Sequence, residues 1–175
     1  MRNNFIRILI KTAAVITILS VMMTAVSCSD EKNKTVSYKD FIGEESYDSP
    51  IYAMVLENIE GEEEPGIIYR EIKEFHSVIN NCDIPVCLYF YSSTATDRAG
   101  ITAGVEDIAQ KLDGRVLIIG IDIMSQREIV SEYEVAYVPD FVLVKNREEK
   151  IGFNAISYEY WTATDVYNWL IEQGV

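Results

Sequence analysis

The stretch that decides the fold is PVCLYFYSSTATDRAGITAGVEDIAQKL, residues 85–112. Its first part, Val86 to Tyr91, is an unbroken apolar run, which predicts a strand covered on both faces. The serines and threonines of residues 92–96, together with Asp97, are typical of a turn that leads into a helix. Apolar residues then recur at spacings of four, three and four, and this pattern predicts an amphipathic helix. They are Ile101, Val105, Ile108 and Leu112.

A second informative stretch is EIVSEYEVAYVP, residues 128–139, which is followed by the apolar run FVLVKN at residues 141–146. Together with residues 85–112, it resembles thioredoxin and its relatives. In that family a strand leads through Phe-Trp-Ala-x-Trp to the redox motif, and Phe90 to Thr94 aligns with this lead without a gap. The later stretch is similar to the family pattern of a helix, Tyr-Gly-Val, two residues and Ile-Pro, followed by a strand and a Lys-Asn-Gly turn. The resemblance covers roughly residues 67–175.

The resemblance implies an α/β, thioredoxin-like fold, in which helices flank a central mixed sheet and the Val138–Pro139 peptide bond is cis. The residues expected to carry the chemistry differ from the family pattern. The two cysteines of the family's Cys-Gly-Pro-Cys motif fall on Ala95 and Arg98, and the buried aspartate that serves them falls on Tyr89. A thiolate is the nucleophile in disulfide exchange, and these aligned residues do not supply one.

Composition narrows the class of partner. A chain of 175 residues is long enough for one domain with a substantial core. Its formal charge of −13 disfavours nucleic acid as a partner. The single histidine, His76, has no cysteine or second histidine nearby in the sequence, and the acidic run at residues 57–64 lacks the alternating ligands of a calcium loop. We therefore expect neither a metal nor a cofactor.

Residues 1–27 are predicted to be a lipoprotein signal peptide. Arg2, Arg7 and Lys11 form a basic start, and residues 12–27 are uncharged, largely apolar and end in small residues. The sequence Ala-Val-Ser-Cys at residues 25–28 resembles a bacterial lipobox, which implies lipid attachment at Cys28. This predicts a bacterial lipoprotein that is anchored to the membrane and lies outside the cytoplasm. The alternative is an uncleaved signal anchor, because residues 12–29 carry no charge.

The remaining chain is expected to consist of a flexible tether at residues 28–50 and a thioredoxin-like domain at residues 51–175. Within the domain, hydrophobic patterns predict strands at residues 51–56, 66–69 and 116–123 and helices at residues 70–80 and 126–133. A hairpin is expected from strands at residues 141–144 and 150–155. Its turn contains Arg147 where the family has glycine. Thr162 or Thr164 is expected to cap the last helix.

Cys82 and Cys87 are the two thiols of the predicted domain, and they do not form a Cys-x-x-Cys motif. They are five residues apart, and this odd spacing directs side chains to opposite faces of an extended chain. We therefore expect buried, inert cysteines. The alternative is a structural disulfide, for which the chain would have to fold back near Asp83.

The resemblance implies a binding site beside the cis-proline. In the family, the backbone there pairs with an extended substrate segment, and a helix N-terminus faces it. The residues expected to line this site are Ser93, Thr94, Ala95, Thr96, Asp97, Arg98, Tyr137, Val138 and Pro139. Arg98 is expected to pair with a carboxylate of the ligand. The alternative is that Asp97 or Thr96 only caps the helix and that Arg98 is solvated.

Three classes of function are compatible with these patterns. The first is a non-catalytic module that binds a protein or peptide partner in the cell envelope. The second is a thiol-disulfide oxidoreductase of the envelope that works through Cys82 and Cys87. The third is a structural role, as an accessory subunit of an envelope complex.

Overall fold

The computed structural model describes residues 37–175. The predicted signal peptide, the predicted lipidation site at Cys28 and the first part of the predicted tether lie outside the described residues. Within residues 37–175, no helix has both the length and the apolar character needed to cross a bilayer.

The centre of the fold is a sheet of seven strands in the order β1-β3-β2-β5-β4-β6-β7. The β4 and β5 strands are parallel, and all other neighbours are antiparallel, so the predicted mixed sheet is confirmed. The strands are β1 (Ile42–Glu45), β2 (Ile51–Glu57), β3 (Gly66–Ile72), β4 (Val86–Tyr91), β5 (Leu117–Asp122), β6 (Asp140–Lys145) and β7 (Glu149–Gly152). Every residue of β4 is buried, as its apolar run predicts.

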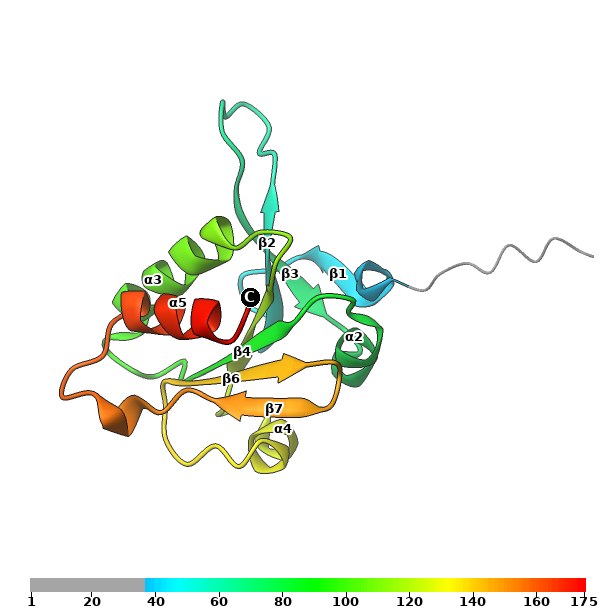
Figure 1. Ribbon diagram of the computed structural model, residues 1–175. Coiled ribbons are helices and arrows are strands. Elements are labelled where there is room, and N and C mark those ends of the chain that lie inside the picture. The colour runs from blue at the N-terminus through cyan, green and yellow to red at the C-terminus, as the bar shows by residue number, and fades with distance from the viewer. Residues whose placement is uncertain (1–36) are drawn as a thin grey trace, which may run out of the picture. The chain divides into compact units, whose positions relative to one another are not determined.

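Helices cover both faces of this sheet (Figure 1). The α3 and α5 helices pack on one face and α2 and α4 on the other, with the 3-10 helix η1 beside α2. The helical elements are η1 (Tyr38–Phe41), α2 (Phe75–Asn81), α3 (Arg98–Lys111), α4 (Arg127–Glu132), η2 (Ala155–Ser157) and α5 (Ala163–Glu172). Thr162 caps α5 in a reciprocal arrangement with Asp165, which confirms one of the two predicted caps.

Two sequence predictions were wrong near the start of the domain. The chain from Arg70 to Ile72 was expected to be helical, but it continues β3, because β2 offers a partner along its whole length. Residues 38–45 were expected to belong to a flexible tether. They form η1 and β1 instead, and β1 pairs with β3. Tyr38, Phe41 and Ile42 pack against the core, and this apolar contact explains the order.

The hairpin between β6 and β7 turns without a glycine. Asn146 and Arg147 both have a left-handed backbone, with φ of 51° and 72°. Such a conformation is rare for residues other than glycine. The antiparallel pairing of β6 with β7 confirms the predicted hairpin, but β7 ends at Gly152, earlier than the predicted end at Ala155. The turn keeps a backbone shape that glycine would adopt more readily.

A stacked pair of tyrosines explains a glycine in the middle of β5. Tyr52 lies directly opposite Gly120 in the sheet and stacks on Tyr69, with ring centroids 4.4 Å apart. A Cβ atom at Gly120 would lie 2.3 Å from Cζ of Tyr52. Gly120 therefore provides the space in which the Tyr52 ring lies.

We predict that Gly120→Ala destabilises the fold by about 1–3 kcal/mol, because the added methyl group overpacks the core against Tyr52. Urea denaturation measures this change. Gly152→Ala in β7 is the matched control, because nothing lies within 4 Å of a Cβ atom built there. Its expected effect is within about 0.5 kcal/mol. Equal effects of the two substitutions would contradict this account of Gly120.

Candidate functional site

The loop between β4 and α3 carries most of the predicted site residues. The α3 helix begins at Arg98, as predicted. Asp122, at the end of β5, holds this loop: its Oδ1 atom accepts hydrogen bonds from the backbone N–H groups of Ser93, at 3.1 Å, and Met124, at 3.2 Å. Asp122 was not among the residues predicted to belong to the site. Its signal is an acidic residue that ends an otherwise apolar strand.

Across from this loop lies the Val138–Pro139 peptide bond, which is cis, as the resemblance implies. Only a narrow crevice of about 30 Å³ separates Pro139 from Ala95 and Arg98. A space of this size is suited to a water molecule and is too small for a side chain. The positions that align with the family's cysteines are therefore not a cavity for a ligand side chain.

Arg98 packs on the aromatic interior of its own domain. Its guanidinium carbon lies 4.7 Å from the ring centroid of Tyr91, within the range of a cation–π contact. One turn further along α3, the Thr102 hydroxyl lies 3.2 Å from the hydroxyl of Tyr89, and both side chains are buried. Arg98 therefore contacts an aromatic ring of its own domain. Its predicted pairing with a carboxylate of a ligand would come in addition to this contact.

Tyr89 takes the place of the strand aspartate that the family resemblance implies. Its ring stacks on Phe141 and Tyr91, with centroids 5.2 Å and 5.5 Å away. Burial raises the pKa of the Tyr89 phenol above its ordinary value, so this side chain is neutral at physiological pH. The position therefore contributes packing and does not supply a carboxylate base.

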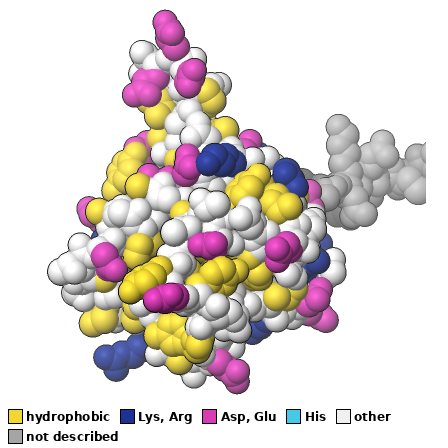
Figure 2. Space-filling view, turned by 60° about the vertical axis from the view of Figure 1, so that its left-hand side comes forward, with side chains coloured by type: hydrophobic (Ala, Val, Ile, Leu, Met, Phe, Trp, Pro, Cys, Tyr) yellow, Lys and Arg dark blue, Asp and Glu magenta, His cyan; other side chains and the backbone are white. Residues whose placement is uncertain are grey.

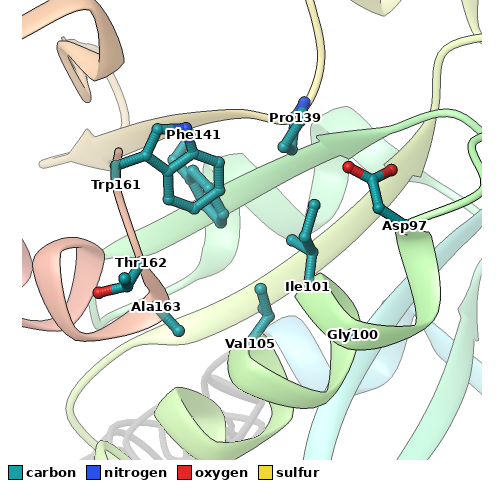
Figure 3. Close-up of a pocket in the computed structure, with 9 residues that line it drawn as sticks. All are labelled: Asp97, Gly100, Ile101, Val105, Pro139, Phe141, Trp161, Thr162 and Ala163. Carbon is teal, nitrogen blue, oxygen red and sulfur yellow. The ribbon is translucent and has the colours of Figure 1, made fainter. Parts of the chain in front are cut away.

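A larger groove, of about 440 Å³, opens on the α5 side of Pro139 (Figure 3). Ile101 and Val105 point from α3 into it, and Trp161 forms the opposite wall. The Trp161 ring packs edge to face on Phe141, with centroids 5.6 Å apart. The full lining is Asp97, Gly100, Ile101, Val105, Pro139, Phe141, Trp161, Thr162 and Ala163.

Asp97 occupies the N-cap position of α3, but its side chain makes no capping hydrogen bond. It is exposed, and its carboxylate points to the side of the groove where Pro139 lies (Figure 3). An N-cap aspartate ordinarily accepts a hydrogen bond from the backbone N–H of the first turn. Asp97 therefore holds the N-cap position without a side-chain hydrogen bond to the helix, and its carboxylate is available at the mouth of the groove.

The structure divides the predicted site residues among three places. Asp97 and Pro139 line the groove. Those that line only the narrow crevice are Ala95, Arg98 and Val138. Neither the groove nor the crevice is lined by Ser93, Thr94 or Thr96. Tyr137 lines a separate polar hollow of about 640 Å³, together with Glu134, Asp140 and Lys150.

Several groove residues were not predicted to belong to the site. Ile101 and Val105 were recognised only as part of the apolar stripe of α3, and Phe141 only as a strand residue. Trp161 lies 22 residues after Pro139 in the sequence, and its one signal is its place immediately before the predicted cap, Thr162. None of these residues belongs to a motif, because the groove forms only when α3, β6 and the start of α5 come together.

The two cysteines of the domain are free and buried, so the alternative of a disulfide is wrong. Cys82 belongs to the core between the sheet and α2, and Cys87 to the core between the sheet and α3. Burial raises the pKa of Cys82 and raises the pKa of Cys87 to about 12. At neutral pH both side chains are therefore thiols, whose nucleophilicity is low.

We predict that iodoacetamide modifies Cys82 and Cys87 slowly in the native protein at pH 8 and rapidly in urea, because the reacting thiolate is scarce in the fold. Mass spectrometry measures both rates. Raising the pH lowers stability above the ordinary thiol pKa of about 8.5, since the unfolded chain releases these protons first. Rapid native alkylation, or insulin reduction that Cys82→Ser and Cys87→Ser together abolish, would contradict the interpretation of inert thiols.

Two observations on the described residues concern the possible binding of a metal ion. Within residues 37–175, no three histidine, cysteine, aspartate or glutamate side chains are placed to hold a metal ion. His76 is exposed, and its Nε2 atom lies 3.7 Å from a carboxylate oxygen of Glu132 on the surface. Its position is that of a surface histidine beside an acid.

The architecture places the chain in a known class: a mixed sheet between two helical layers, with a cis-proline loop facing the N-terminus of the helix after the central strand. The sequence model of the thioredoxin family matches residues 66–159, more than half of the chain. The chain therefore belongs to the thioredoxin family.

Individual relatives are moderately similar. Thioredoxin of Rickettsia bellii is 28% identical over 78 residues, which are 45% of this chain and 74% of that protein. Thioredoxin of Haemophilus influenzae is 26% identical over 80 residues, 46% of this chain and 75% of that protein.

Solved structures are also similar to this chain. Mitochondrial thioredoxin 3 of Saccharomyces cerevisiae has a TM-score of 0.43 and 21% identity, and the match covers 58% of this chain and 84% of that one. The first thioredoxin domain of mouse protein disulfide-isomerase A4 has a TM-score of 0.44 and 19% identity, with 51% and 63% covered.

Proposed function

We propose that this thioredoxin-family chain binds an extended protein or peptide segment without carrying out disulfide exchange. The observation that carries the proposal is the open groove beside Pro139, which is lined mainly by apolar side chains, combined with Ala95 and Arg98 at the positions of the family's cysteines. Its volume of about 440 Å³ falls within the usual range for ligand pockets, roughly 300–1,000 Å³.

Binding and redox chemistry make separate demands on this fold. Binding needs a groove and unpaired backbone groups beside the proline, and it does not require sulfur. Disulfide exchange needs an accessible thiolate. Cys87 lies near the start of β4, whereas the groove lies beyond its end, and burial raises the pKa of this thiol to about 12. These facts support a binding module over the alternative of an oxidoreductase.

We predict that Gly100→Gln weakens peptide binding about tenfold or more. Gly100 lines the groove, and a Cβ atom there has no neighbour within 4 Å, so a longer side chain fills the groove without disturbing the core. Ala103→Gln is the matched control, because Ala103 is exposed on the same helix and does not line the groove.

The experiment uses heptapeptides selected from a random display library on the full chain in detergent. Their dissociation constants for the original chain and the two variants are measured by isothermal titration calorimetry. If Gly100→Gln and Ala103→Gln have equal effects, or if no peptide is selected, the groove is not the binding site and the proposed function fails.

The proposal includes a lipid anchor outside the cytoplasm. It rests on the basic residues before an uncharged apolar stretch and on the lipobox-like Ala-Val-Ser-Cys at residues 25–28. Its role would be to hold the binding domain close to the membrane surface.

We predict that the chain incorporates labelled palmitate in a bacterial host and fractionates with membranes, and that Cys28→Ser abolishes the label. Cys82→Ser serves as the control, because a buried thiol of the domain should not be acylated. Membrane fractionation of the original chain without any palmitate label would rule out the lipoprotein and favour the uncleaved anchor.

A further inference from the structure

The segment that leads from β7 to α5 exposes large apolar side chains shortly before Trp161 in the sequence. The exposed fractions are 79% for Ile156, 40% for Tyr158 and 85% for Tyr160. The segment continues directly into Trp161, the wall of the groove. In Figure 2, which turns this side of the molecule forward, hydrophobic side chains gather near the centre of the face. Aromatic side chains left exposed beside an apolar groove are typical of binding surfaces.

The charges around this surface are acidic. Asp97 lines the groove with a carboxylate that makes no capping hydrogen bond, and Glu159 is exposed between Tyr158 and Tyr160. The whole segment from Phe153 to Asp165 contains no lysine or arginine. In Figure 2 acidic side chains lie among the central hydrophobic ones, while most basic side chains lie nearer the margins of the face.

Arg98 is the basic side chain adjacent to Asp97 in sequence, but it does not line the groove. Its guanidinium lies against the Tyr91 ring, in the narrow crevice on the other side of Ile101. It is also half-buried. Its charge is therefore directed to the tyrosines of the core, and the mouth of the groove keeps the negative character that Asp97 gives it.

From this arrangement we infer that the groove takes a large apolar side chain from a polypeptide segment that carries lysine or arginine beside it. This inference rests on the proposed function and specifies its ligand. The apolar side chain would contact Ile101, Val105 and Trp161. The flanking basic side chains would pair with Asp97 and Glu159 and lie over the exposed tyrosine rings, a contact that is also favourable to cations.

Three synthetic nonapeptides test this specificity against the full chain in detergent. The first has a central phenylalanine flanked by lysines, the second the same phenylalanine flanked by glutamates, and the third a central serine flanked by lysines. At low salt we expect the first peptide to bind about tenfold more tightly than either of the others. The difference between the first two should shrink in 1 M salt, because exposed charges are then screened.

Charge reversal tests whether Asp97 and Glu159 cause the preference for lysine-flanked peptides. The double variant Asp97→Lys, Glu159→Lys should prefer the glutamate-flanked peptide. The matched control, Glu62→Lys, Glu64→Lys, makes the same change in net charge in the exposed loop between β2 and β3, and it should keep the preference of the original chain. If both double variants alter the preference equally, only net charge matters and the inference is overturned.

The outcomes separate this inference from the proposed function. If the lysine-flanked and glutamate-flanked peptides bind equally and Gly100→Gln weakens both, the groove binds peptides but the inferred specificity is wrong. If the central serine peptide binds as tightly as the central phenylalanine peptide, the apolar requirement is wrong. If none of the peptides binds and no library peptide is selected either, both proposals fall.

Discussion

The burial of β4 on both faces is the constraint on which the rest of the structure depends. This strand lies between β5 and β6, and its side chains enter the two cores alternately. A strand in this position must be apolar throughout, and its neighbours must supply all of its backbone hydrogen bonds. Its ends are consequently fixed. The chain leaves β4 at Tyr91 directly beneath the start of α3, where Asp122 holds the loop.

The same constraint also supports the proposed binding function, because it positions the elements that form the groove. The groove depends on where α3 begins, on the loop at Pro139 and on the ring of Trp161. None of these depends on the identity of the side chains at positions 95 and 98. Replacement of an acid by Tyr89 adds an aromatic ring to a core that already contains Phe141 and Tyr91. The fold therefore gains apolar packing where the family pattern has a polar group.

The aromatic residues connect the core to the proposed binding surface. Phe141 contacts Tyr89 inside the core and Trp161 at the groove, and Phe153 contacts both tryptophans. Rings packed in this way hold one another in place, because each has several large neighbours. A groove wall supported from the core requires little ordering when a ligand binds, which favours affinity.

By itself, the sequence determined the central strand, the start of α3, the hairpin, the last helix and the cis-proline loop, because these depend on local periodicity or on a motif. The sequence also predicted correctly that Cys82 and Cys87 are buried on opposite faces, because side chains five residues apart in an extended chain point in opposite directions. Only the tertiary structure decided the extent of β3, the order of residues 38–45, the free orientation of Asp97 and the groove itself. The extent of β3 depends on β2, the order of residues 38–45 depends on α2 and β3, and the groove forms where Trp161 faces Ile101. The partners in each case are far apart in the chain. Contacts of this kind leave no periodic signal, because they arise only when separate elements pack together.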